Sequence, residues 1–159
     1  MPLKIREAIP KDSQTIFDFI MELAIYEKLP NAVKTTVKEI KDSIFAPNST
    51  VKALICEEDG KAIGYAVYFY NYSTWLGKKG IYLEDLYVNE SKRGKGAGKA
   101  MIKYLAKKAI SEKCGRFEWA CLDWNTPSRE FYESLGAVAL NEWIGYRLEG
   151  DALEKFANN

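Results

Sequence analysis

Residues 81–101, IYLEDLYVNESKRGKGAGKAM, place an apolar, acid-bearing run shortly before a stretch with three glycines and three basic side chains at residues 93–101. The first part is typical of a buried strand, and the residues after the glycines have apolar side chains at helical spacing. Helix N-termini offer unpaired N–H groups, and glycines let an anion approach the backbone closely. We therefore expect a phosphate-binding turn here rather than a simple flexible connection.

The rest of the chain alternates strand-like and helix-like patterns. Asp59-Gly60 is a hairpin signal, and Gly136 is placed to end a helix. The order predicts one mixed α/β domain over residues 1–159, with antiparallel pairing in the hairpin and parallel pairing across helical crossovers. The expected strands are 3–8, 51–58, 61–70, 81–88, 116–122, 137–140 and 142–150, and the expected helices are 13–26 with a cap at Asp12 or Ser13, 35–45, 98–115, 126–135 and a short one from near Asp151.

Composition excludes several classes of function. The balance of 23 Lys and Arg against 22 Asp and Glu gives no polyanion-binding signature, so no nucleic acid partner is expected. The N-terminus lacks an apolar signal region, no run is long enough for a bilayer, and three cysteines indicate reduced thiols, so we expect a cytoplasmic protein without a membrane partner. Histidine is absent, which excludes Ser-His-Asp and Cys-His catalysis and the commonest zinc sites, and no metal is expected.

Two familiar phosphate-binding motifs fail on spacing. A Walker loop requires a glycine where Arg93 stands and a Ser or Thr where Ala100 stands. A dinucleotide fingerprint requires G-x-G-x-x-G, whereas Gly94, Gly96 and Gly98 alternate strictly. The pattern that remains is R-G-x-G-x-G.

The run YLEDLYV followed by RGKGAGKAM resembles the acetyl-CoA site of the GNAT N-acetyltransferases. The chain is most similar to the spermidine/spermine (diamine) and thialysine acetyltransferase branch, through LAIYEKL, WLGKKGIYLEDLYV, DWNTPSREFYESLGA and YRL. The resemblance implies a GNAT fold, with a central twisted mixed sheet of about six to seven strands flanked by four helices plus a short C-terminal helix. It also implies acetyl-CoA as cosubstrate, a small-molecule amine as acceptor, and a homodimer.

The resemblance assigns the coenzyme to three segments. It implies that the N–H groups of residues 94–99 hold the pyrophosphate, that the preceding strand end pairs with the pantetheine arm, and that the helix near residue 126 adds contacts. The implied cofactor-binding residues are Leu86, Tyr87, Val88, Arg93, Gly94, Lys95, Gly96, Ala97, Gly98, Lys99, Asn125, Thr126, Pro127, Ser128 and Tyr132.

Acetyl transfer to an amine needs a deprotonated nucleophile and a protonated leaving thiolate. Glu84 and Asp85 lie in an apolar strand, where a buried carboxylate needs a partner or a function, and strand alternation separates them unless a bulge intervenes. The alternative is that one or both of these carboxylates, Asp85 above all, form structural ion pairs. The resemblance implies that Glu84 is the base, directly or through water, and that Tyr132 is the general acid, in a direct transfer within a ternary complex.

Carboxylates and aromatic rings suit an acceptor that carries ammonium groups. The expected substrate-binding residues, with Glu142 as a further candidate, are Tyr26, Glu27, Trp75, Glu84, Asp85, Glu118, Trp119 and Ala120. Ser73 and the bulky apolar residues near 143 replace acids expected in the polyamine enzymes, which favours a short diamine or a lysine-like acceptor. Three alternatives stay open: another amine such as an aminoglycoside or a protein N-terminus, a non-catalytic CoA-binding sensor, or a nucleotide-phosphate-binding module.

Overall fold

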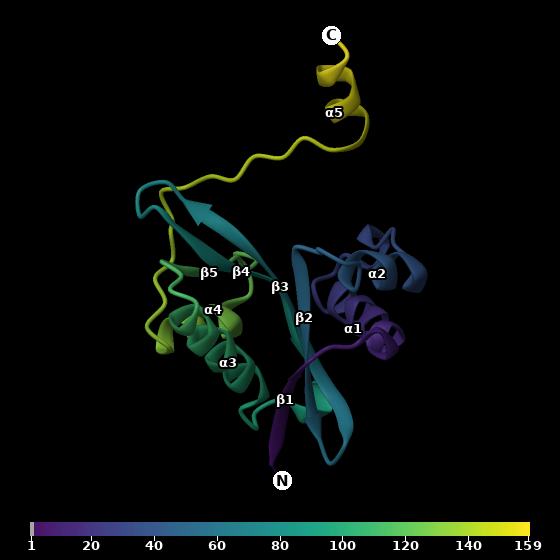
Figure 1. Cartoon of the computed structure of the whole chain (residues 1–159), viewed down its shortest axis with the longest axis vertical. Helices are drawn as coiled ribbons and strands as arrows, with labels where there is room; N and C mark the ends of the chain where they lie inside the picture. Colours follow the sequence, from purple (N-terminus) through teal and green to yellow (C-terminus); the bar gives the residue numbers. More distant parts are fainter. Residues whose placement is uncertain (1) are drawn as a thin grey trace. The chain divides into compact units, whose positions relative to one another are not determined.

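The computed structural model describes residues 2–159 and divides into two units, one up to Ala120 and one from Cys121 to Asn159. The elements are coloured along the chain in Figure 1. The first unit holds β1 Leu3–Glu7, α1 Ser13–Tyr26, α2 Val37–Ile44, β2 Val51–Glu58, β3 Lys61–Ser73, β4 Lys78–Val88, α3 Ala97–Ser111 and β5 Phe117–Trp119, with short 3-10 helices η1 Pro10–Asp12, η2 Pro30–Ala32 and η3 Glu90–Lys92. The second unit holds α4 Thr126–Ser134 and α5 Gly150–Ala157.

One mixed sheet with the order β1-β2-β3-β4-β5 forms the centre of the first unit. The first four strands pair antiparallel, and β4 pairs parallel with β5 because the chain crosses over through α3 between them. Asp59 and Gly60 connect β2 to β3 with φ of 53° and 76°, as the hairpin signal predicts. The mixed pairing expected from the sequence is therefore confirmed.

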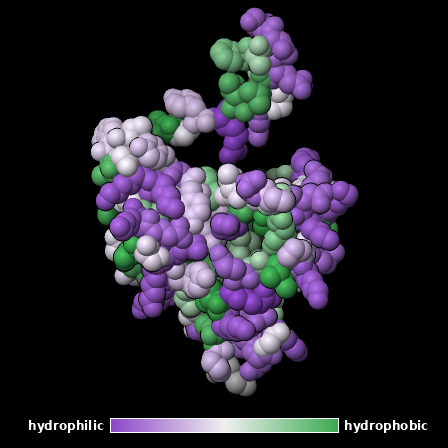
Figure 2. Space-filling view, in the orientation of Figure 1, coloured by the Kyte–Doolittle hydropathy of each residue, from purple (hydrophilic) through white to green (hydrophobic). Residues whose placement is uncertain are grey.

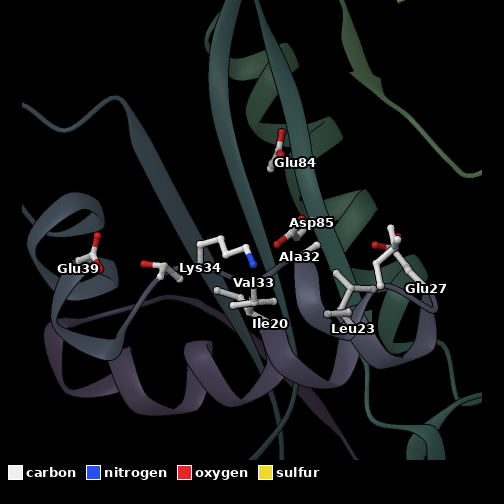
Figure 3. Close-up of a pocket in the computed structure, with 12 residues that line it drawn as sticks. Ile20, Leu23, Glu27, Ala32, Val33, Lys34, Glu39, Glu84 and Asp85 are labelled. Atoms are coloured by element: carbon white, nitrogen blue, oxygen red, sulfur yellow. The ribbon is translucent and has the colours of Figure 1, made fainter. Parts of the chain in front are cut away.

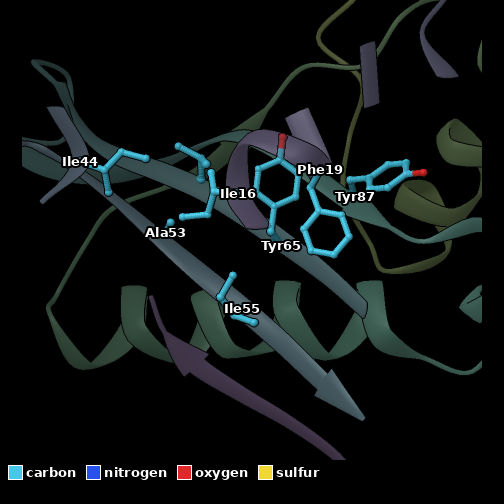
Figure 4. Close-up of a cluster of buried hydrophobic side chains, with 8 residues drawn as sticks. Ile16, Phe19, Ile44, Ala53, Ile55, Tyr65 and Tyr87 are labelled. Atoms are coloured by element: carbon cyan, nitrogen blue, oxygen red, sulfur yellow. The ribbon is translucent and has the colours of Figure 1, made fainter. Parts of the chain in front are cut away.

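Helices cover both faces of this sheet. On one face, Ile16 and Phe19 of α1 and Ile44 of α2 pack against the odd-numbered side chains of β2 and β3, which include Ile55 and Tyr65 (Figure 4). The intervening residues of the same strands, among them Leu54 and Ala66, are buried on the opposite face, where α3 packs with Met101 and Leu105. Burial on both faces explains why β2 and β3 are apolar without alternation.

Local signals place the helix ends in both units. The first helix begins at Ser13 as expected, but the Asp12 carboxylate does not cap it: it pairs with Arg6 at 2.8 Å and accepts from the Ile9 N–H at 2.7 Å. In α4, the Asn125 side chain accepts a hydrogen bond from the Ser128 N–H at 3.3 Å, and Gly136 follows the helix with φ of 95°.

Two expected strands are absent from the described second unit. Residues 137–140 and 142–150 form no strand, and α5 begins at Gly150, so the sheet has five strands and not six to seven. A strand exists only where a neighbour satisfies its N–H and C=O groups, and the recorded backbone bond within this stretch is a turn from Trp143 N–H to Leu140 C=O at 3.2 Å. The strand expected over residues 116–122 is likewise shortened, to Phe117–Trp119.

Hydrophilic side chains cover most of the face seen in Figure 2, with hydrophobic ones in smaller groups between them. Within residues 2–159, no helix combines the length and the apolar character that a bilayer span requires.

Replacing Ile55 by Ala tests the assignment of the core. Ile55 is fully buried between the sheet and α1, so we expect a loss of about 2–5 kcal/mol in the free energy of unfolding, measured by urea denaturation. Ile110→Ala, at a site 79% exposed on α3, is the matched control and should change stability by less than about 0.5 kcal/mol. Equal effects of the two substitutions would contradict the assignment.

Candidate active site

A β-bulge at Glu84 shapes the end of β4. Val67 of β3 faces Asp85, whereas the next residue, Tyr68, faces Leu83, so Glu84 is the extra residue of the bulge. A bulge bends its strand and changes the direction of the side chains around it. As a result, Glu84 and Asp85 both line the same pocket, which plain alternation would prevent.

The pocket lies between the C-terminal half of α1, the segment from η2 to the first turn of α2, and the bulged part of β4 (Figure 3). Its volume is about 580 Å³, enough for a small molecule. Apolar side chains of α1 and η2 form part of the wall, and the charged groups come from all three elements. The lining residues are Ile20, Leu23, Ala24, Glu27, Leu29, Ala32, Val33, Lys34, Thr35, Glu39, Glu84 and Asp85.

Burial raises the pKa of two carboxylates of this pocket. The hydroxyl of the fully buried Tyr65 donates a hydrogen bond to Asp85 Oδ2 at 2.8 Å, but burial outweighs this bond and raises the pKa of Asp85. Burial, and then the nearby charge of Asp85, raise the pKa of Glu27. Asp85 forms no ion pair with any residue that the structure describes, so the alternative of a structural ion pair is not what is found.

The glycine-rich turn follows β4 and η3. Gly94 and Gly96 have φ of 82° and 87°, in the left-handed region that favours glycine, and Gly96 immediately precedes the first residue of α3. Along the described chain, the N–H groups of residues 94–99 donate to no backbone carbonyl. A Cβ at Gly94 or Gly96 would meet nothing within 4 Å, so the turn is open on that side. The turn thus presents a row of unpaired donors at the positive end of a helix dipole.

Arg93 connects this turn to the pocket. Its guanidinium lies over the ring of Tyr26 at 4.6 Å and over that of Tyr87 at 5.2 Å, and its Nε donates to the Val88 carbonyl at 2.9 Å. Tyr87 in turn donates from its hydroxyl to Glu22 of α1 at 3.1 Å. These contacts hold the turn against the last residue of α1.

The outer edge of β4 is free of a strand beyond the bulge. Pairing with β5 ends at Leu83 and Trp119, whereas pairing with β3 continues to Val88. Within the first unit, residues 86–88 therefore have one edge without a strand neighbour. An edge of this kind can pair with an extended ligand that carries amide groups.

The structure brings together only part of the expected acceptor site. Glu27, Glu84 and Asp85 line the pocket. Tyr26 is not part of the lining, but it precedes Glu27 in the sequence. Trp75 is 84% exposed at the tip of the β3–β4 hairpin and does not line the pocket. The segment Glu118, Trp119 and Ala120 is on or just after β5, and it too is outside the lining.

The remaining expected residues belong to the second unit. Asn125 caps α4 and is buried, Thr126, Pro127 and Ser128 form the first turn, and the Tyr132 ring is 5.5 Å from that of Phe131. Glu142 lies in the irregular segment before α5. The roles proposed for these residues stay predictions.

The pocket also contains residues that the sequence did not single out. Lys34 and Glu39 line it from the segment before α2 and from the first turn of α2. The only local signal there is a short polar stretch between Pro30 and the capping residue Thr36, and such a stretch is not specific for a binding site.

Comparisons with known proteins agree with this geometry. The acetyltransferase (GNAT) family model matches residues 17–137. This chain belongs to the GNAT acetyltransferase family. It is 38% identical over 164 residues to a thialysine N-epsilon-acetyltransferase of Sus scrofa, covering 96% of each chain. It is 34% identical over 152 residues to spermidine/spermine N(1)-acetyltransferase-like protein 1 of Homo sapiens, covering 91% of this chain and 22% of that protein.

A solved structure has the same overall architecture. An integron cassette protein from the mobile metagenome of V. cholerae superposes with a TM-score of 0.84 at 28% identity, covering 100% of this chain and 99% of that one. The expected GNAT fold and the expected enzyme class, an N-acetyltransferase acting on an amine, are therefore confirmed. The sheet has five strands, slightly fewer than the six to seven expected.

The environment of Asp85 predicts a pH-dependent stability difference for Asp85→Asn. Because burial raises the folded-state pKa, the stability associated with this group is complete below the ordinary aspartate pKa of about 4 and is lost as the pH rises through the folded pKa. The variant has no carboxyl group to ionise and so does not lose this stability as the pH rises. At pH 8 we therefore expect its melting temperature to be a few degrees above that of the wild type, and near pH 4 we expect the two melting temperatures to be equal.

Circular dichroism melting curves between pH 4 and pH 8 measure this difference. Asp18→Asn, at an exposed position on α1, is the matched control and should show no such trend. A variant at Asp85 that is less stable than the wild type at every pH would contradict the interpretation.

Proposed function

We propose that this protein is an acetyl-CoA-dependent N-acetyltransferase that acetylates a primary amine of a small diamine or polyamine, or of a lysine-like acceptor such as thialysine, by direct transfer in a ternary complex. The single observation that carries the proposal is the row of unpaired N–H groups at residues 94–99, beside a pocket that contains carboxylates. The names of the two relatives, a thialysine and a spermidine/spermine-like acetyltransferase, support the acceptor class.

The turn at residues 94–99 fits the diphosphate of a coenzyme. Its N–H donors are unpaired, the α3 dipole favours negative charge, and Arg93, Lys95 and Lys99 add positive charge. The free edge of residues 86–88 suits the amides of a pantetheine arm. The bound cosubstrate would supply the acetyl thioester, and the residues of the pocket would supply the acceptor and the proton transfers.

The pocket suits an amine. Glu27, Glu84 and Asp85 provide negative charge for ammonium groups, and the apolar wall from Ile20 and Leu23 suits a methylene chain. A base is needed because an ammonium cannot attack a carbonyl carbon. We assign this role to Glu84, directly or through water, and Tyr132 is the proposed donor of the proton to the leaving thiolate.

Asp85 is a second candidate for the base. Burial raises its pKa towards neutral pH, as an efficient general base requires, and it lines the same pocket as Glu84. Its hydrogen bond from Tyr65 fixes the orientation of the carboxylate.

Gly96→Ala tests the coenzyme turn. The added methyl group has space, but a φ of 87° is unfavourable for alanine by about 1–2 kcal/mol, so the N–H row should be displaced. We expect acetyl-CoA affinity, measured by calorimetry, to fall about tenfold or more. Gly77→Ala is matched for strain, with φ of 64° and open space at the β3–β4 tip, and should leave affinity unchanged. If the two variants bind acetyl-CoA with equal affinity, the turn at residues 94–99 does not bind the coenzyme.

Substitutions of the proposed acid and base test the chemistry. Tyr132→Phe should lower kcat by about tenfold or more with little change in acetyl-CoA affinity, whereas Tyr146→Phe, at a site 94% exposed, should have no effect.

Glu84→Gln should move the pH–rate profile to higher pH, because the amine must then lose its proton without help. If Asp85→Asn moves the profile and Glu84→Gln does not, Asp85 is the base.

The acceptor is identified by acetyl-CoA consumption across putrescine, spermidine, spermine, lysine, thialysine, an aminoglycoside and a peptide with a free N-terminus. Turnover of the short amines supports the proposal. Coenzyme binding without turnover of any amine would favour a sensor, and turnover of only the last two would favour the other acetyltransferase classes.

A further inference from the structure

Lys34 is the one basic side chain among the described residues that line the acceptor pocket, whose other charged groups are the carboxylates of Glu27, Glu39, Glu84 and Asp85. Figure 3 shows its side chain reaching from the segment before α2 toward the strand that carries Asp85. In this view it lies between Glu39 on one side and the two β4 carboxylates on the other. A pocket for a molecule with only positive charges has no evident use for this ammonium group.

The Lys34 ammonium is not committed to a structural ion pair. Some other lysines of the first unit are paired, as Lys38 is with Asp42 at 2.6 Å and Lys92 with Glu58 at 2.9 Å. Lys34 forms no ion pair and no hydrogen bond in the part of the chain that the structure describes. Asp85 is hydrogen-bonded to Tyr65 instead, so Lys34 does not serve to neutralise it.

Hydrogen bonds on both sides hold the short segment that carries Lys34. Before it, the Leu29 N–H donates to the Ala24 carbonyl at 2.8 Å, and η2 follows with Pro30 as its first residue. After it, the Thr36 hydroxyl accepts from the Glu39 N–H at 3.1 Å and caps α2. Only residues 33–35 lie between these two anchors, so the position of Lys34 relative to the pocket is determined by the fold.

The charge pattern distinguishes two kinds of acceptor. A diamine brings ammonium groups alone, which the carboxylates attract and Lys34 repels. An amino acid with a side-chain amine brings a carboxylate as well, which can pair with Lys34 while Glu39 faces the neighbouring α-ammonium and the distal amine faces Glu84 and Asp85. The second arrangement places a group of opposite charge next to Lys34, Glu39 and the two β4 carboxylates, whereas a diamine offers none to Lys34.

We propose that Lys34 binds the carboxylate of an amino-acid acceptor and so makes the enzyme select amino acids with a side-chain amine over diamines of the same length. This inference rests on the proposed function and narrows its acceptor class. Lys34 is a specificity-determining residue and takes no part in the proton transfers.

Matched acceptor pairs isolate the carboxylate. Lysine and cadaverine, like ornithine and putrescine, differ only by that group, and lysinamide keeps its size but removes its charge. For the wild type we expect kcat/KM to be about ten- to a hundredfold higher for lysine than for cadaverine or lysinamide, the range of a charge-assisted hydrogen bond. Lys34→Gln should abolish this preference by lowering kcat/KM for lysine and raising it for cadaverine.

Two further variants complete the test. Lys34→Arg keeps the positive charge and should keep the preference, and Lys41→Gln, at an exposed site of α2 outside the pocket lining, should behave as the wild type. If Lys34→Gln has the same lysine-to-cadaverine ratio as the wild type, the inference is wrong although the acetyltransferase stands. If no amine is acetylated, the proposed function fails, and calorimetric binding of lysine against lysinamide to both proteins then decides whether Lys34 recognises a carboxylate.

Discussion

The hydrogen-bonding pattern of β4 is the constraint on which the rest of the site depends. Its inner edge pairs with β3 as far as Val88, whereas its outer edge loses β5 after Leu83, and the bulge at Glu84 falls at the same point. The strand therefore gains an extra residue where it loses the neighbouring strand β5. The loss of β5 exposes the backbone at the outer edge of β4, and the bulge brings Glu84 and Asp85 to the pocket. The glycine turn follows η3 along the same chain. One stretch of backbone thus positions both candidate binding surfaces.

The Asp85 carboxylate is kept at a cost to the fold. It is half-buried with one hydrogen bond, from Tyr65, and without an ion pair in the described residues, and its burial disfavours the charged form. A stability-driven sequence would place an uncharged group there. Burial also raises the pKa of Glu27, so two carboxylates of the same pocket have shifted pKa values, and such groups cluster at functional sites.

The features that the sequence predicted well are those with local physical causes. The boundaries of α1, the turn at Asp59-Gly60 and the start of α3 depend on apolar spacing and on glycine at positive φ, and both are visible within a few residues. The strands expected over residues 137–140 and 142–150 are not found, because a strand-like sequence shows only that a segment can pair, whereas a strand forms only with a partner. Only some of the residues that line the pocket were predicted, because its lining also depends on contacts between distant parts of the chain. Glu27, Glu84 and Asp85 lie in sequence runs that resemble the family, LAIYEKL and YLEDLYV. Lys34 lies outside those runs and joins the pocket only through tertiary packing.

Arg93 gives the two candidate binding surfaces a common support. Its guanidinium lies over the rings of Tyr26 and Tyr87 while Nε donates to the Val88 carbonyl, so its positive charge is held beside the turn. Tyr26 ends α1, and the next residue, Glu27, lines the acceptor pocket. The contact that orients positive charge at the glycine turn therefore also fixes the end of the helix that bounds the pocket, and displacement of either surface disturbs the other.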